Sequence, residues 1–254
     1  MIYPGLVSVT FRQLAPAEIV GLVVQAGLLG IEWGGDIHVT HGDFKRAREV
    51  NKITTDAGLK VFAYGSYYRV GESEAALPFE KVLETAVSLK APLIRVWAGS
   101  SSSVDAGPAY RNRVVSDTLR IAAMASEANI IISYEFHKGS LTDTYESAMK
   151  LMEEVGHDNV RLYWQTPLTT DAEENLAGLD RILPWATNTH VFNWSRATES
   201  FQPLEQVCNI WHRYLQKFAA SNHDHAAMLE FVKDNSPDMF LEDAKTLRKL
   251  LKEI

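Results

Sequence analysis

Short runs of apolar, often β-branched residues alternate along the chain with longer segments that have the period of an amphipathic helix. Runs of this length are typical of strands buried on both faces. The longer segments repeat apolar residues three and four positions apart, as helices that cover a sheet do. The predicted strands are Gly5–Thr10, Leu28–Trp33, Leu59–Tyr64, Leu93–Trp97, Ile130–Glu135, Val160–Trp164, Thr189–Phe192 and Met228–Val232.

Residues that favour helix ends stand between these strands. They are Asp43 before a helix that ends near Gly58, Pro108 at the start of another, Thr142 or Asp143 before a third, Asp171 before a fourth, and about Leu241 at the start of the last. Strand-then-helix units of about 30 residues favour a closed (β/α)8 barrel, or TIM barrel, which is typically about 250 residues long. Because no Gly-, Ser- or Pro-rich linker divides the chain, residues 1–254 are predicted to form one domain. No GxGxxG motif follows the first strand, which disfavours a doubly wound nucleotide-binding sheet.

Composition narrows the class of partner. The chain has 25 Lys and Arg against 32 Asp and Glu, a formal charge of −7, so it is a poor electrostatic match for nucleic acid or an anionic membrane. A small-molecule partner is therefore expected. A single cysteine, Cys208, excludes an intrachain disulfide and a cysteine-based zinc framework. The chain has no signal-peptide pattern and no long apolar window, so we expect a cytoplasmic protein.

In a TIM barrel, residues at the carboxyl ends of the strands face the active site. Polar and aromatic residues concentrate at these ends. They are Glu32, Trp33, Tyr64, Arg95, Trp97, Glu135, His137, Trp164, Gln165, His190, Asn193 and Glu230.

The alternation within two strands directs carboxylates inward. Ser133, Glu135 and His137 share one face of the fifth strand, and the apolar residues between them suit the helix-covered face. Glu230 shares a face with Met228 and Val232 in the eighth strand. An unpaired buried charge is costly, so each carboxylate needs a cation, a proton or an arginine partner.

Two readings of these carboxylates follow. With His190 and the oxygen of Gln165 they would form a site for a hard metal ion with open positions. Alternatively, Arg95 could pair with either carboxylate in an ordinary ion pair.

At these residues the chain resembles the xylose-isomerase-like barrels, a group also known as sugar phosphate isomerases/epimerases. The resemblance covers nearly the whole chain. The stretches that carry it are Gly30–His38, Tyr134–His137, Asn159–Gln165, His190–Trp194 and Leu229–Phe231.

The resemblance implies that Glu135, Gln165, His190 and Glu230 hold a divalent metal ion, such as Mn, Mg, Co or Zn. Gln165 departs from the family pattern, because the usual residue there is the aspartate of an Asp-x-x-His motif, whose histidine is replaced by Leu168. The site would therefore carry one negative charge fewer, which weakens binding of a hard ion.

The resemblance further implies that a sugar or polyol binds beside the metal. The residues expected to contact it are Trp33, His38, Arg95, Trp97, His137, Trp164, Asn193 and Arg196. Packing in the core is the competing role for Trp97 and Trp164, and structural hydrogen bonding competes for His38. Lys138 and Arg12 could hold a phosphate, but no phosphate-cradling glycine loop is present, so an unphosphorylated substrate is expected.

The implied function is that of a metal-dependent sugar isomerase or epimerase. Glu135 and Glu230 would act as the acid/base pair, with the pKa of one raised while the other stays ionised. A hydro-lyase acting on a keto-inositol or sugar acid would use the same groups, and a sugar-binding barrel without turnover also remains open. An abasic-site endonuclease is disfavoured, because it needs more metal ligands and a basic surface. Many barrels of this group form homo-oligomers, but the sequence sets no number of subunits.

Overall fold

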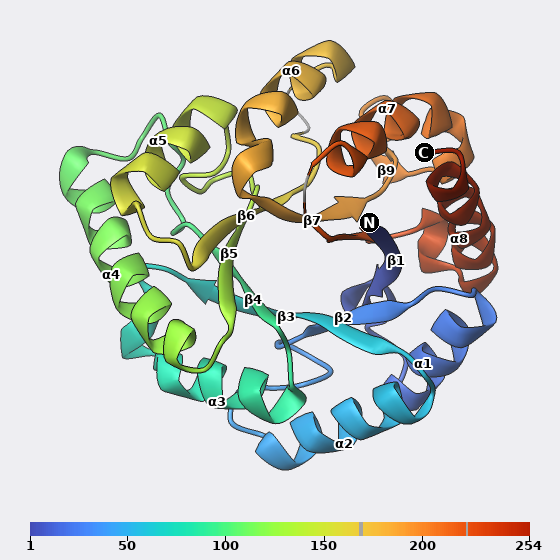
Figure 1. Ribbon diagram of the computed structural model, residues 1–254, viewed down its shortest axis with the longest axis horizontal. Coiled ribbons are helices and arrows are strands. Elements are labelled where there is room, and N and C mark those ends of the chain that lie inside the picture. The colour runs from blue at the N-terminus through green and yellow to red at the C-terminus, as the bar shows by residue number, and fades with distance from the viewer. Residues whose placement is uncertain (168–169, 222) are drawn as a thin grey trace.

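The computed structural model describes residues 1–167, 170–221 and 223–254, and its centre is a closed barrel of parallel strands (Figure 1). Around the barrel the strands follow the order β1-β10-β7-β6-β5-β4-β3-β2. Their bounds are β1 Ile2–Val7, β2 Gly30–Gly34, β3 Lys60–Arg69, β4 Leu93–Trp97, β5 Ile131–Glu135, β6 Val160–Trp164, β7 Ala186–Val191 and β10 His225–Leu229. The predicted (β/α)8 barrel architecture is confirmed for the described residues.

Helices surround the barrel, one after each strand of the closed sheet (Figure 1). Their bounds are α1 Pro16–Gln25, α2 Phe44–Asp56, α3 Phe79–Leu89, α4 Pro108–Glu127, α5 Tyr145–Val155, α6 Ala172–Ile182, α7 Cys208–Ala219 and α8 Pro237–Lys252. None of the described helices is both long enough and apolar enough to cross a bilayer. A small antiparallel hairpin, β8 (Trp194–Ser195) with β9 (Ser200–Phe201), follows β7 and was not predicted.

The helix starts were predicted with mixed success. Asp43 caps α2 through its side chain, and Asp171 caps α6 in a reciprocal capping box. The cap of α5 is Thr144, whose hydroxyl accepts from Ser147, so the prediction of Thr142 or Asp143 was wrong by one or two residues. Helix α8 starts at Pro237, earlier than predicted, because Ser236 provides its cap.

Two apolar layers hold the fold together. The larger, called the outer layer, lies between the strands and the helices. The smaller fills the barrel interior and consists of Val7, Val9, Ala63, Leu93, Tyr163, Ala226 and Met228. Strand alternation assigns residues to these layers. On β2, for example, Glu32 points inward while Ile31 and Trp33 pack against the helices.

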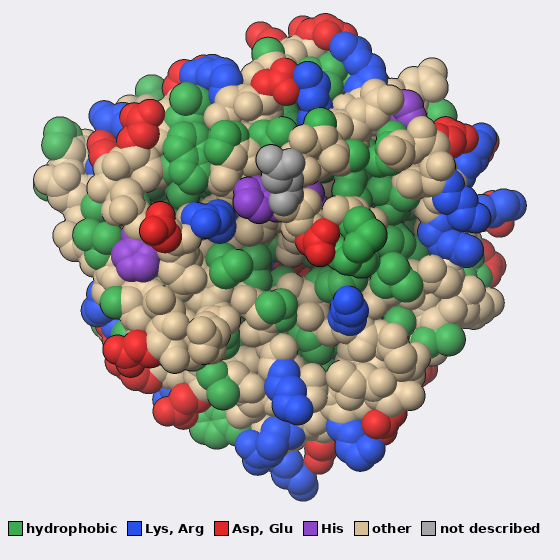
Figure 2. Space-filling view, viewed as in Figure 1, with side chains coloured by type: hydrophobic (Ala, Val, Ile, Leu, Met, Phe, Trp, Pro, Cys, Tyr) green, Lys and Arg blue, Asp and Glu red, His purple; other side chains and the backbone are tan. Residues whose placement is uncertain are grey.

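Ion pairs join neighbouring helices on the outer surface. Arg181 of α6 pairs with Glu146 of α5 at 2.6 Å, and Lys217 of α7 pairs with Asp180 of α6 at 2.8 Å. Charged side chains of both signs lie along the edge of the face in Figure 2, and uncharged atoms make up most of its middle. Exposed pairs of this kind contribute little to stability, so the two apolar layers carry most of it.

Asp243 on α8 is a buried ionisable group, and it should make the free energy of unfolding depend on pH. Its carboxylate accepts from the backbone of Leu204 at 2.8 Å, and burial raises the pKa of Asp243 to about 6. Because the folded state disfavours the charged form of Asp243, this residue destabilises the folded state fully above about pH 6. Its destabilising effect disappears below about pH 4. Asp243→Asn should therefore increase the free energy of unfolding at pH 7.5 by about 1–3 kcal/mol.

Urea unfolding at pH 7.5 and pH 4 measures this effect, with the exposed substitution Glu153→Gln as control. The gain from Asp243→Asn should shrink at the lower pH, because the folded carboxyl is then protonated and the unfolded one, with an ordinary pKa of 3.8, is about half protonated. An equal gain at both pH values would contradict the assignment.

Candidate active site

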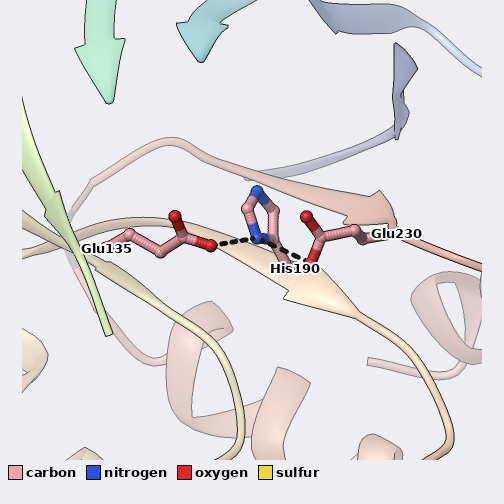
Figure 3. A group of neighbouring side chains, drawn as sticks. All are labelled: Glu135, His190 and Glu230. Atoms are coloured by element: carbon pink, nitrogen blue, oxygen red, sulfur yellow. Dashed lines mark ion pairs between the residues drawn. The ribbon is translucent and has the colours of Figure 1, made fainter. Parts of the chain in front are cut away.

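A cluster of two carboxylates and one imidazole closes the carboxyl end of the barrel interior. Glu135 is the last residue of β5, His190 lies near the end of β7, and Glu230 directly follows β10. Figure 3 shows the two carboxylates on opposite sides of His190, each directed toward its ring. Nδ1 of His190 lies 3.4 Å from Glu135 and 3.2 Å from Glu230, and the three side chains are all buried.

The donor set fits a divalent metal ion. One ligand atom from each residue lies within 4.8 Å of the others. Nε2 of His190 is 3.3 Å from the Glu32 carboxylate, which can only accept, so Nε2 carries a proton. Nδ1 then faces the two carboxylates, and this buried atom has no hydrogen-bond partner among the described residues. Two carboxylates around one nitrogen require a positive charge between them, which either a proton on Nδ1 or a divalent ion in its place would supply.

Arg95 links this cluster to a deeper carboxylate. Its Nε donates to Glu32 at 2.7 Å and its Nη1 donates to Glu135, while Trp97 Nε1 also donates to Glu135. Tyr163 donates its hydroxyl proton to Glu32 at 2.5 Å. The guanidinium and the Glu32 carboxylate lie against β3 at Gly65, where a Cβ atom would stand 2.7 Å from both groups.

These contacts determine which groups are charged. Burial raises the pKa of Glu135, but Arg95 and His190 outweigh burial and hold its pKa well below the usual range. Arg95 and His190 likewise lower the pKa of Glu32 to about 2 despite its burial. Burial disfavours a charged His190, yet Glu230 and Glu32 raise its pKa well above the ordinary value. Glu135 is therefore ionised.

Glu32 is a site residue to which the sequence assigned no role. It is completely buried and contacts Arg95, Tyr163 and His190. Its place at a strand end was visible, but β2 reads Gly-Ile-Glu-Trp-Gly, in which small, apolar and polar residues do not alternate cleanly. Only the observed pairing shows that Glu32 faces inward.

A cavity of about 340 Å³ opens above the cluster. Its lining combines the carboxylates with cationic, amide and aromatic side chains. The lining residues are Arg12, Tyr67, Arg95, Trp97, Glu135, His137, Gln165, Phe192, Trp194, Phe201, Glu230 and Phe231. Of the residues predicted to contact substrate, Arg95, Trp97 and His137 therefore lie in this lining.

Two aromatic walls of the cavity depend on unusual backbone conformations. Tyr67 and Phe231 have φ values of 56° and 54°, a left-handed conformation that is rare for bulky residues. Phe231 packs against Phe201 of the β8–β9 hairpin with ring centroids 5.2 Å apart. Its conformation interrupts the strand alternation, so Val232 joins the outer layer and not the inner face predicted for it. Strained positions of this kind cluster at functional sites.

Three residues predicted to contact substrate lie elsewhere, which corrects the sequence analysis. Trp33 and Trp164 are fully buried in the outer layer, and Trp164 packs edge-on against Trp211 and Tyr214 of α7. Both follow strand alternation, because their inward-facing neighbours are Glu32 and Tyr163. His38 is buried with Nδ1 2.9 Å from the Ser8 hydroxyl and is absent from the cavity lining, which favours its structural role.

The remaining candidates lie beside the cavity. Asn193 donates to the carbonyl of Pro203 at 2.9 Å, and with Arg196 it lines a neighbouring cavity of about 190 Å³. Phe192 and Trp194 form walls of both cavities. Lys138 lines a third cavity of about 560 Å³, which shares His137 and Gln165 with the first. Leu168 lies outside the described residues.

Gln165 takes part in the cluster through its amide nitrogen. Nε2 donates to Glu135 at 3.2 Å and to the carbonyl of Phe136 at 2.5 Å. Both partners are acceptors, so the assignment of amide nitrogen and oxygen is consistent. The contact with Glu135 is one that an aspartate at this position could not make. Gln165 thus supports a carboxylate of the cluster in this structure, and its role as a metal ligand stays a prediction.

Comparison with known proteins identifies the family. A family model described as xylose isomerase-like TIM barrel matches residues 20–250, so the chain belongs to that family. A curated 3-dehydroshikimate dehydratase of Bacillus anthracis is 23% identical over 283 aligned positions, covering 96% of this chain and 95% of the relative.

Solved structures have the same fold. The crystal structure of a probable 3-DHS dehydratase, AsbF, from Bacillus anthracis has a TM-score of 0.80 at 22% identity, covering 98% of this chain and 99% of that one. The apo structure of the 3-keto-D-glucoside 4-epimerase YcjR from E. coli has a TM-score of 0.74 at 14% identity, covering 99% and 100%. The relatives thus include a dehydratase and an epimerase, which supports enzyme status for this chain.

Proposed function

We propose that this chain is a divalent-metal-dependent isomerase or epimerase that moves a proton at the carbon next to the carbonyl group of a polyhydroxylated keto compound. The observation that carries the proposal is the buried cluster of Glu135, His190 and Glu230, with Nδ1 of His190 between two carboxylates. Glu135, His190 and Glu230 would hold the ion, with Gln165 as a fourth candidate.

A bound divalent ion would polarise neighbouring carbonyl and hydroxyl oxygens and so acidify the adjacent C–H group. The carboxylates of the chain would then move the proton. Glu135, kept ionised by Arg95, suits the acceptor. Glu230 stands on the opposite side of His190 (Figure 3), so a carbon between the two carboxylates can lose a proton on one side and gain one on the other. That arrangement favours inversion at the carbon.

The pocket walls would keep water from the reacting carbon. Trp97, Phe201 and Phe231 present apolar surface, and Trp97 also holds Glu135 through its indole N–H. Aromatic walls of this kind pack against the apolar face of a sugar ring and strengthen the electrostatic contacts inside the cavity.

A hydro-lyase reaction is the second candidate, and His137 favours it. Nδ1 of His137 lies 2.8 Å from the carbonyl of Lys138, so Nδ1 carries the proton and Nε2 is available as a base. The ring lies 4.5 Å from Trp97 and lines the cavity. Nε2 of His137 would take the proton next to the carbonyl and pass it to the hydroxyl on the adjacent carbon, which would leave as water. The similarity to a 3-dehydroshikimate dehydratase supports this candidate.

Proton exchange in D₂O tests the proposal. The Mn²⁺-loaded protein is incubated with ketohexoses, inososes and cyclic polyhydroxylated keto acids, and mass spectrometry follows each compound. We expect deuterium incorporation next to the carbonyl, slowed about 10²–10⁴-fold by Glu135→Gln and by Glu230→Gln. A shift to an epimer or an isomeric ketose indicates the first candidate, and loss of one water indicates the second.

The exposed substitution Glu127→Gln serves as the matched control and should leave the exchange rate unchanged. Exchange that both active-site substitutions leave intact would refute the assignment of the carboxylates. Tight binding of a compound with no exchange would instead support a sugar-binding barrel without turnover.

A further inference from the structure

Arg12 is a cation of the cavity lining that the catalytic cluster does not use. It directly follows the short 3₁₀ turn Ser8–Phe11 after β1 and shares the cavity with Glu135 and Glu230. Its side chain is 47% exposed, whereas both carboxylates are buried. Arg12 therefore lies at the outer end of the cavity that the two carboxylates close at its bottom.

Two neighbours fix the orientation of this guanidinium. Nη2 of Arg12 lies 2.5 Å from the Asp36 carboxylate and donates to the hydroxyl of Tyr67 at 3.4 Å. Both contacts use the same nitrogen. For Nε and Nη1 no protein partner is found in the described ranges, so part of the planar fork stays open to a ligand. Tyr67 itself is held in a left-handed conformation with its ring in the cavity lining.

The balance of charge in the cavity admits an anion. Arg95, another cation of the lining, is paired with Glu32 and Glu135 and is fully buried. Among the residues that the structure describes, Arg12 is paired only with Asp36. Gln165 adds no charge where the family pattern has an aspartate. With a divalent ion opposite Glu135 and Glu230, no net negative charge remains among these groups to repel an anionic substrate.

We propose that Arg12 binds the carboxylate of the substrate, which makes the substrate a polyhydroxylated carboxylic acid and not a neutral sugar. This inference rests on the proposed function, because the opposite end of the same molecule must reach Glu135 and Glu230. The open Nε and Nη1 groups of Arg12 lie on different edges of the guanidinium, so each can donate a charge-assisted hydrogen bond to a carboxylate oxygen. A phosphate group, with more oxygens and more charge, would require more donors than Arg12 has open.

Isothermal titration calorimetry, which measures the dissociation constants of a matched pair of compounds, tests the proposal. D-gluconate and D-gluconamide have the same hydroxyl groups and differ only at the carboxylate, and both are titrated into Mn²⁺-loaded protein at low salt. Wild type should bind gluconate about fivefold to tenfold more tightly than gluconamide, because charge-assisted hydrogen bonds at a half-exposed site are of modest strength. Arg12→Gln should abolish this preference, and Arg12→Lys should restore part of it.

Two controls separate local from general effects. Arg69→Gln removes a cation that lies over Trp97 but outside the cavity lining, and it should keep the preference. The affinity for Mn²⁺ should be the same in wild type and Arg12→Gln, because Arg12 contacts none of the candidate ligands. A further titration compares fructose 6-phosphate with fructose.

The outcomes are distinct. Equal affinity for the two probes, binding of neither, or a preference that survives Arg12→Gln overturns the proposal. Selectivity for fructose 6-phosphate that depends on Arg12, without selectivity for gluconate, also overturns it in favour of a phosphate. Absence of Mn²⁺ binding in wild type is a failure of the proposed function, and the direct metal titration registers it separately.

Discussion

Replacing His190 with alanine is expected to remove both the bound divalent ion and turnover. Nδ1 of His190 is the atom that faces both Glu135 and Glu230, and its loss leaves two carboxylates without a nitrogen ligand between them. Loss of a residue behind the ligands typically costs a metal site 10–100-fold in affinity, so loss of a ligand itself should cost at least about 100-fold. The proton exchange described above should fall to background.

Elemental mass spectrometry of the purified protein and thermal unfolding with and without Mn²⁺ measure this result. At a Mn²⁺ concentration of about 100 times the dissociation constant, the ion should raise the free energy of unfolding of wild type by about 2.7 kcal/mol. The same concentration should raise that of His190→Ala hardly at all. His212→Ala, at a half-buried position of α7 outside the cavity lining, is the matched control. His190→Asn, which keeps an oxygen donor, provides a second variant if alanine destabilises the barrel interior.

The contrary result is equally clear. Near-stoichiometric metal in His190→Ala, with an unchanged gain in thermal stability, would place the ion elsewhere and refute the cluster as its site. If wild type takes up no metal after loading, a metal-free binding function explains the site better than a metal-dependent enzyme does.

The barrel could be predicted because burial on both faces leaves a strong signal in sequence. Apolar runs such as Leu93–Trp97 and Val160–Trp164 coincide with β4 and β6 as observed. Alternation within β5 also predicted that Ser133 and Glu135 point inward, since period two follows directly from strand geometry. The same rule, applied to β6, would have placed Trp164 outside the barrel, where it lies.

Other parts of the site have no local signal. Tyr67 and Phe231 take left-handed conformations that their residue types disfavour, so the contacts around them determine the backbone. The β8–β9 hairpin is too short for periodicity to show, yet it provides Trp194 and Phe201 to the cavity. The partners of Arg12 are separated from it by tens of residues. Such long-range contacts emerge only when the barrel closes.

Glu32 provides the second large prediction, because it organises the site without lining the cavity. Its carboxylate accepts from Nε of Arg95 and lies beside Nε2 of His190. Glu32→Gln would replace one acceptor oxygen with an amide that faces these donors. The His190 ring would lose the partner that fixes its protonation pattern, and Arg95 would have Glu135 alone as its counter-charge. Both changes should draw Glu135 and His190 away from an ion.

We therefore expect Glu32→Gln to weaken Mn²⁺ binding about 10–100-fold, as loss of an outer partner of a histidine ligand does. Electron paramagnetic resonance of Mn²⁺ measures the affinity directly. At saturating metal, kcat should fall more than KM rises, because the substrate does not contact Glu32. Tyr163→Phe is the matched control, since it removes a hydrogen bond to Glu32 but keeps every charge, and its effect should be smaller.

Glu32→Asp separates positioning from folding. The shorter carboxylate retains the charge, so it should recover part of the Mn²⁺ affinity, whereas a purely structural role would follow the loss of side-chain volume and show no such recovery. Circular dichroism confirms that each variant is folded before the metal titration. If Glu32→Gln binds Mn²⁺ as tightly as wild type, the buried carboxylate only neutralises Arg95, and the orientation of His190 depends on the packing of its ring against Tyr163, 4.6 Å away.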